Sequence, residues 1–381
     1  MRLARALFIC GSLLAAGGAA GPAGQGRPAA SAANTVESRA EAARTSGRLD
    51  EAAALYREAL AARPRWAEGL WALGTIAYEQ DDFAECRAVF SRLVAVQPKM
   101  AVAWALRGLC EFRLGAWASA REHVEKGLSL GMPPGEDLTR VVLYHQATLL
   151  VREAKFDLAI APLRSILQFQ GPTAELELAC GLVLLRRPVL PQAIPAAALD
   201  LVKEAGRAYC ASLARHPELA APRFEALIAK YPRERHLHYG YGLALAQRGS
   251  AGAVEQYRRE VELFPDDVLA RVELGFALLA QGRMEEAVLP AEAAAELAPG
   301  LFVTHLVLGR ALAATGRVER GIRELERAAA LQPRIPEIQL ALARAYAQAG
   351  RKPEADRANA AFQALEAARR GPQKAPGPGV P

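Results

Sequence analysis

Hydrophobic residues recur along this chain every three or four positions, in stretches of about 12 to 16 residues separated by short breaks. This spacing is typical of amphipathic α-helices, and no alternating pattern of a half-buried strand competes with it. The pattern therefore predicts an all-α fold made of antiparallel helix pairs joined by tight turns. The breaks fall at Gly47, Asp81, Gly115, Gly249, Gly282, Gly316 and Gly350.

Prolines mark a fixed period in the same pattern. Pro64 and Pro98 are 34 residues apart, and steps of 33, 34 and 34 residues join Pro232, Pro265, Pro299 and Pro333. A period of this length is the signature of stacked helical repeats, in which each unit packs only on its neighbours. A chain of 381 residues is too long for one compact core, but a solenoid has no such limit.

Small and large residues also recur at fixed places within the period. Gly74 and Gly108 fall midway along first helices, where a glycine costs about 1 kcal/mol relative to alanine. Cys86 occupies a small-residue position of a second helix, and the bulky Phe90 follows four residues later. We therefore expect large side chains to pack against small ones, so that neighbouring helices approach closely.

In combination these residues resemble the tetratricopeptide repeat (TPR) in a protein of the exported bacterial type. The resemblance rests on Trp71-Ala72-Leu73-Gly74, Tyr78, Cys86, Phe90 and Pro98, and on Leu274-Gly275, Ala287 and Pro299. It implies a right-handed superhelical solenoid of helix-turn-helix units, whose first helices line a concave groove that holds a peptide or partner segment. The repeats are expected at about 33–66, 67–100, 101–134, 140–172, 234–267, 268–301, 302–335 and 336–369.

The chain divides into six segments on this basis. Residues 1–20 have the charged, apolar and small-residue regions of a signal peptide, with cleavage expected near Ala20. Lipidation of Cys10 is the less favoured alternative, because the bulky Ile9 precedes it. A flexible linker (21–34) and a disordered tail (370–381) flank the folded part. The mature protein is therefore expected in the periplasm or outside the cell, without a transmembrane helix.

The folded part consists of an N-terminal TPR array at 35–172 and a C-terminal TPR array at 233–369, with an irregular segment between them. In the irregular segment 173–232, Pro188, Pro191 and Pro195 cannot lie inside a regular helix. Helices are expected near 174–186, 198–215 and 218–230. Two interpretations stay open, a drifted connection between the arrays and a hinge between two arms.

The repeat register places one set of side chains on the groove. Arg310 and Arg344 are one repeat apart and should stack along it, and aromatic residues beside such arginines suit a peptide with an acidic or carboxylate-bearing end. The alternative is that the arginines are solvated and pair with nearby glutamates. The lysine and asparagine clamp of carboxylate-binding TPR proteins is not found. The expected groove residues are Trp71, Tyr78, Phe112, Arg113, Tyr144, Arg152, Phe276, Arg310 and Arg344.

Other chemistry is scarce. The net charge of +6 is spread among interleaved acids and bases, so no nucleic-acid partner is expected. No catalytic motif, cofactor motif or metal-ligand spacing is found, and His236 and His238 would point apart on one helix. The pair Asp266-Asp267 is interpreted as helix capping. The oligomeric state is not indicated.

Four cysteines remain after the expected processing, at positions 86, 110, 180 and 210. All are interpreted as buried thiols that act as small apolar residues. An even number in an exported protein also permits disulfides, and a Cys180–Cys210 bridge is the alternative.

Two functions are compatible with these features. The first is a non-catalytic scaffold of the cell envelope that binds a protein or peptide partner. The second is an accessory factor of an envelope glycan or lipid pathway that binds an enzyme or a carbohydrate.

Overall fold

The computed structural model describes residues 35–133 and 135–370. These ranges contain nineteen α-helices, one short 3-10 helix and no strand, which confirms the all-α TPR solenoid. No helix within them is both long and apolar enough to cross a bilayer. The predicted signal peptide and linker lie outside the described residues, and so does the predicted tail except for its first residue, Arg370, which ends the last helix. The described residues fall into two compact units, unit 1 up to Gly206 and unit 2 from Arg207.

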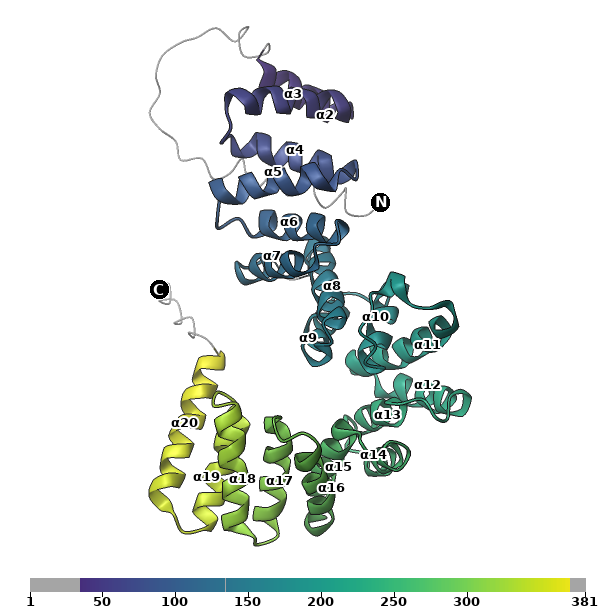
Figure 1. Cartoon of the computed structure of the whole chain (residues 1–381), viewed down its shortest axis with the longest axis vertical. Coiled ribbons are helices and arrows are strands. Elements are labelled where there is room, and N and C mark those ends of the chain that lie inside the picture. The colour runs from purple at the N-terminus through teal and green to yellow at the C-terminus, as the bar shows by residue number, and fades with distance from the viewer. Residues whose placement is uncertain (1–34, 134, 371–381) are drawn as a thin grey trace, which may run out of the picture. The chain divides into compact units, whose positions relative to one another are not determined.

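Unit 1 is a stack of helical hairpins followed by the irregular segment (Figure 1). Each hairpin packs on the next, because the second helix of one repeat contacts the first helix of its successor. The helices are α2 (Val36–Thr45), α3 (Leu49–Ala62), α4 (Ala67–Glu79), α5 (Phe83–Val96), α6 (Ala101–Arg113), α7 (Trp117–Ser129), α8 (Asp137–Arg152), α9 (Phe156–Leu167) and α10 (Ala174–Leu184), with the 3-10 helix η3 (Pro191–Ala193) after them.

Unit 2 repeats the same hairpin arrangement. The helix α11 (Ala196–Leu213) contains the division between the units, so the division lies inside the irregular segment. The other helices are α12 (Pro217–Lys230), α13 (Leu237–Ala246), α14 (Gly252–Leu263), α15 (Val268–Ala280), α16 (Met284–Leu297), α17 (Phe302–Ala314), α18 (Val318–Leu331), α19 (Pro336–Gln348) and α20 (Lys352–Arg370).

Large side chains fill the spaces beside the mid-helix glycines, as the recurring residues predicted. Phe90 is fully buried, and a Cβ atom at Gly74 would lie 2.9 Å from the tip of its ring. A Cβ atom at Gly309 would lie 2.6 Å from Cγ of Leu325. Any larger residue at these glycines would push the two helices of a hairpin apart, which explains why the unfavourable helix propensity of glycine is tolerated.

The irregular segment is closely packed, and two glycines decide its packing. A Cβ atom at Gly181 of α10 would lie 1.9 Å from the carbonyl oxygen of Val202 in α11. A Cβ atom at Gly206 would lie 1.7 Å from the carbonyl oxygen of Glu177. The backbones of α10 and α11 are therefore in direct contact, and only glycine fits at either point.

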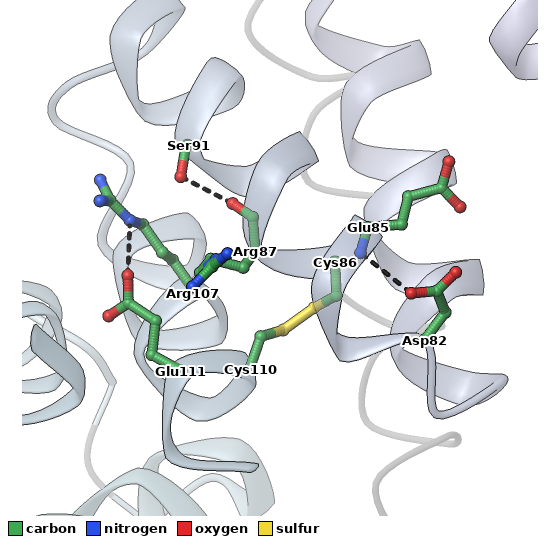
Figure 2. The surroundings of a disulfide bond; sticks show 8 residues. All are labelled: Asp82, Glu85, Cys86, Arg87, Ser91, Arg107, Cys110 and Glu111. Carbon is green, nitrogen blue, oxygen red and sulfur yellow. Dashed lines mark hydrogen bonds and ion pairs between the residues drawn. A yellow bond between two sulfur atoms is a disulfide. The ribbon is translucent and has the colours of Figure 1, made fainter. Parts of the chain in front are cut away.

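The cysteine interpretation was wrong for one pair. Figure 2 shows a disulfide between Cys86 of α5 and Cys110 of α6, whose Cα atoms are 6.2 Å apart. The bond links the second helix of one repeat to the first helix of the next. Cys86 still occupies the predicted small-residue position, but a period within repeats does not show which residues of successive repeats face each other. Cys180 and Cys210 are buried thiols.

Candidate partner-binding groove

Three equivalent positions of successive first helices form a column in unit 2. Phe276 of α15, Arg310 of α17 and Arg344 of α19 are each one 34-residue period apart. The first helices pack directly on one another, since α15 contacts α17 and α17 contacts α19. The guanidinium carbon of Arg310 lies 5.3 Å from the ring centre of Phe276. The structure thus brings together the three groove residues that were predicted in the C-terminal array.

An open cavity of about 380 Å³ lies beside the two arginines. Its walls are largely apolar, with Leu279, Met284 and Leu340 around small alanine residues such as Ala313 and Ala341. Because the alanine side chains are small, they leave space beside the two arginines. A volume of this size accommodates one or two side chains of a partner segment.

The arginines have no acidic partner of their own. Arg310 and Arg344 are both exposed to solvent, as the alternative expected, but among the described residues no carboxylate lies within ion-pair distance of either, so the expected pairing with glutamates is not found. Glu337 lines the same cavity, but its ion-pair partner is Arg369, at 3.7 Å. Partial desolvation, and the positive charge of Arg344, lower the pKa of Arg310. A bound carboxylate would relieve this repulsion and accept the guanidinium hydrogen bonds.

Two of the aromatic residues predicted for the N-terminal groove belong to the core instead. Trp71 is 6% exposed and packs edge-on against Phe90. Phe112 is 8% exposed and packs edge-on against Trp117 and His145. Neither ring is available to a partner. The repeat register predicts which face of a helix lines the groove, but not the exact rotation of the helix about its axis. The packing of neighbouring helices therefore decides which side chains are covered.

Two tyrosines of unit 1 are half-buried and remain partly accessible. Tyr78 packs edge-on against Phe83, with ring centres 5.8 Å apart. Tyr144 lines a cavity of about 420 Å³ formed by residues of α8, α9 and α10. Burial, and the nearby Glu175 carboxylate, raise the pKa of Tyr144 to about 12, so its hydroxyl stays protonated at neutral pH.

The sequence of unit 2 matches a TPR family model at residues 214–252, 249–301 and 306–375. A second TPR model matches residues 43–110 of unit 1. The matched residues make up more than half of the chain. The chain is a tetratricopeptide repeat protein. TPR repeats are interaction modules, so it is a protein-binding scaffold at this level of description.

Solved structures with local similarity to this TPR protein include several of MamA. MamA 41-end from Desulfovibrio magneticus RS-1 is 23% identical, with a TM-score of 0.37, over 41% of this chain and 88% of that one. MamA MSR-1 C2 is 22% identical, with a TM-score of 0.39, over 45% and 99%. At this level of similarity the matches say nothing about what the chain binds. No curated protein matches the sequence significantly.

The two predicted groove arginines of unit 1 have a role at the junctions of the TPR repeats. Arg113 ends α6 and stacks over Phe83, the first residue of α5, at 4.3 Å. Arg152 ends α8 and stacks over Trp117, the first residue of α7, at 5.2 Å. Each contact ties a repeat to its neighbour and contributes about 0.5–1 kcal/mol. Arg113 also forms an ion pair with Asp81 at 3.6 Å, whereas Arg310 of unit 2 has the contact with Phe276 but no carboxylate partner among the described residues.

The same contact occurs a third time, at a residue that sequence reasoning missed. Arg186 follows α10 and stacks over Phe156, the first residue of α9, at 4.9 Å. It also forms an ion pair with Asp157 at 3.1 Å. The sequence contains a signal for this contact. An aromatic residue begins the second helix of one repeat, and an arginine stands at the end of the first helix of the next repeat.

Glu273 of α15 provides a pH prediction for unit 2. Burial raises the pKa of this half-buried carboxyl above its ordinary value of 4.5. The folded state therefore binds the proton more tightly than the unfolded state, and the stability from this group is present below pH 4.5 and lost as the pH rises through the folded pKa. We expect Glu273→Gln to raise the Tm at pH 8 by about 2 °C and to leave it unchanged at pH 4.

The matched control for that measurement is Glu255→Gln, because Glu255 is exposed on the neighbouring helix α14. It should leave the Tm unchanged at both pH values. Thermal unfolding followed by circular dichroism across pH 4–8 gives both curves. Equal shifts for the two variants would show that the burial of Glu273 does not set the pH dependence.

Proposed function

We propose that this TPR protein is a non-catalytic scaffold that binds an acidic partner segment along the column Phe276, Arg310 and Arg344. The observation that carries the proposal is the pair of neighbouring arginines that line one largely apolar cavity, with no acidic partner in the described part of the chain. Arginine suits such a site because its planar fork binds a carboxylate through two parallel hydrogen bonds. The apolar cavity and the Phe276 ring would hold side chains of the same segment.

We place this scaffold in the cell envelope. The signal-peptide pattern of residues 1–20 supports export, and so does the Cys86–Cys110 disulfide. Disulfides persist mainly in oxidising compartments and are rare in the cytosol. Cell fractionation with an antibody against the chain tests this location, and recovery in the cytosolic fraction would contradict it.

Binding to an array of 12-residue peptides tests the ligand chemistry. We expect the wild-type chain to prefer peptides with Glu and Asp beside apolar residues over the same peptides with Gln and Asn. Arg310→Glu/Arg344→Glu should weaken the binding of the preferred peptides at least about tenfold, because two charge-assisted contacts become repulsive. Fluorescence anisotropy with the best labelled peptide gives the Kd values.

The control carries the same charge change away from the groove. Arg323 on α18 and Arg334 after it are exposed, and Arg323→Glu/Arg334→Glu should bind like the wild type. If both double variants weakened peptide binding equally, the effect would come from the change in net charge and not from the groove. An unchanged Kd in the groove variant would refute the site, and a preference for neutral glycans over all peptides would favour the accessory-factor function.

A further inference from the structure

Three side chains that could bind a metal ion converge inside unit 2. His236 precedes α13, Glu260 lies on α14 and Asp267 precedes α15. Their ligand atoms, His236 Nδ1 and one carboxylate oxygen from each acid, lie within 4.8 Å of one another. All three residues are more than nine-tenths buried, with exposures of 8%, 0% and 2%.

Backbone groups hold the two carboxylates in place. The N–H groups of His236 and Tyr239 donate to the two oxygens of Glu260, at 2.5 and 3.1 Å. Oδ1 of Asp267 accepts from the N–H group of Ala270 at 3.0 Å, which caps α15 as predicted. The other oxygen of Asp267 is thereby directed toward His236. Ligands of protein metal sites are oriented by hydrogen bonds of this kind.

Two atoms of the cluster have no hydrogen bond. In the described part of the chain, only three buried side-chain polar atoms lack a hydrogen-bond partner, and two of them are Nδ1 of His236 and Oδ2 of Asp267. They face each other at 3.0 Å. The two atoms lie within ion-pair distance, but neither makes a hydrogen bond of good geometry, and buried polar atoms nearly always make one. A metal ion would bind both atoms at once.

The acidic side chains around this point also favour a cation. Glu260, Asp267 and the adjacent Asp266 are three carboxylates, and Arg235 is the one arginine among them. Arg235 is directed mainly at Asp266, at 2.7 Å, and its Nε lies 3.5 Å from Oδ2 of Asp267. A divalent ion bound between Glu260 and Asp267 would balance the charge of these two buried carboxylates, and a buried uncompensated charge is costly.

We propose that His236, Glu260 and Asp267 form a structural site for a divalent first-row metal ion, best represented by Zn²⁺. Zinc binds imidazole nitrogen and carboxylate oxygen at about 2.0–2.2 Å, so two adjacent ligands lie about 3.0–3.5 Å apart. The 3.0 Å separation of Nδ1 and Oδ2 matches this value. Glu260 supplies the third ligand. The ion links the start of α13 to α14 and to the start of α15, and so stabilises the packing of these three helices of unit 2.

His238, the residue that the sequence pairs with His236, takes no part in the site. Its Nδ1 lies 2.8 Å from the side-chain oxygen of Gln256. His236 lies outside the helix, in a left-handed backbone conformation with φ of 69°, and this places its ring among the acids of other helices.

Two substitutions remove one ligand each and keep its structural role. Asparagine tolerates the left-handed conformation, so His236→Asn keeps the N–H group that Glu260 accepts. Asparagine is also a good N-cap, so Asp267→Asn keeps the bond to Ala270 and loses the anionic Oδ2. His238→Asn is the matched control. The untagged chain is stripped with EDTA and dialysed against Zn²⁺, and bound metal is measured by mass spectrometry.

We expect one Zn²⁺ per wild-type chain, the same value for His238→Asn, and a loss of affinity of at least about tenfold in both ligand variants. The Tm of the wild type should rise with Zn²⁺ concentration and that of the ligand variants should not. Far-UV circular dichroism of the variants without metal shows whether they are folded. Absence of bound Zn²⁺ in the folded wild type, or equal binding by His236→Asn, would overturn the proposal in favour of a metal-free His–Asp pair.

Discussion

Gly181→Ala is expected to lower the free energy of unfolding of unit 1 by more than about 3 kcal/mol, although alanine is the better helix former by about 1 kcal/mol. The added Cβ atom would lie 1.9 Å from the carbonyl oxygen of Val202. Neither atom belongs to a flexible side chain, so α10 and α11 have to separate. Overpacking against backbone lies at the costly end of the range for core substitutions.

Tryptophan fluorescence is the measurement for this change, because all four tryptophans lie between Trp66 and Trp117 and therefore in unit 1. Urea unfolding curves of wild type and variant give the difference. Gly171→Ala is the control in the same unit, since nothing lies within 4 Å of a Cβ atom at that glycine. It should be neutral or slightly stabilising. A Gly181→Ala curve that coincides with the control would show that α10 and α11 are not in backbone contact.

Loss of the Cys86–Cys110 disulfide is expected to lower the stability of unit 1 by about 3 kcal/mol. The bond closes a loop with a sequence separation of 24 residues, and the loss of chain entropy in the unfolded state sets its contribution. The variant Cys86→Ala/Cys110→Ala removes the bond and keeps small side chains at both buried positions. Urea unfolding of the oxidised wild type and of this variant, again followed by tryptophan fluorescence, measures the difference.

Dithiothreitol supplies the internal control for the disulfide. It should lower the stability of the wild type to that of the double variant and leave the variant unchanged. Cys180→Ala should respond to the reductant as the wild type does. A non-reducing digest should contain one peptide pair that joins the segments of Cys86 and Cys110. If the reductant destabilised the double variant as much as the wild type, the stabilising disulfide would have to be a different one.

The column of Phe276, Arg310 and Arg344 could be predicted from the sequence because its members are separated by the repeat period itself. Residues one period apart occupy equivalent places on parallel first helices, whatever the details of packing. Trp71 and Phe112 could not be placed in the same way. Both lie on first helices of the predicted register, yet contacts with Phe90 and Trp117 cover them. Burial depends on the rotation of a helix against its neighbours, and a period does not record that rotation.

The cluster of His236, Glu260 and Asp267 could not be found from spacing. Its members lie at the ends and on the face of three different helices, and the left-handed backbone of His236 turns the ring toward them. The disulfide is hidden for a related reason, since Cys86 and Cys110 meet across two repeats. Sequence reasoning detects a site when its residues share an element or a period, and neither condition holds here.

The sequence by itself determined the repeat architecture of this protein: its helices, their breaks at glycine, the prolines that end each repeat, and the equivalent positions of Arg310 and Arg344 in successive repeats. These features follow from local preferences and from a period that acts between neighbours only. The tertiary structure decided which cysteines pair, which aromatic rings are buried, and where α10 and α11 touch through Gly181 and Gly206. Those outcomes depend on contacts of a few ångströms between helices, and the same hydrophobic pattern is compatible with several such arrangements.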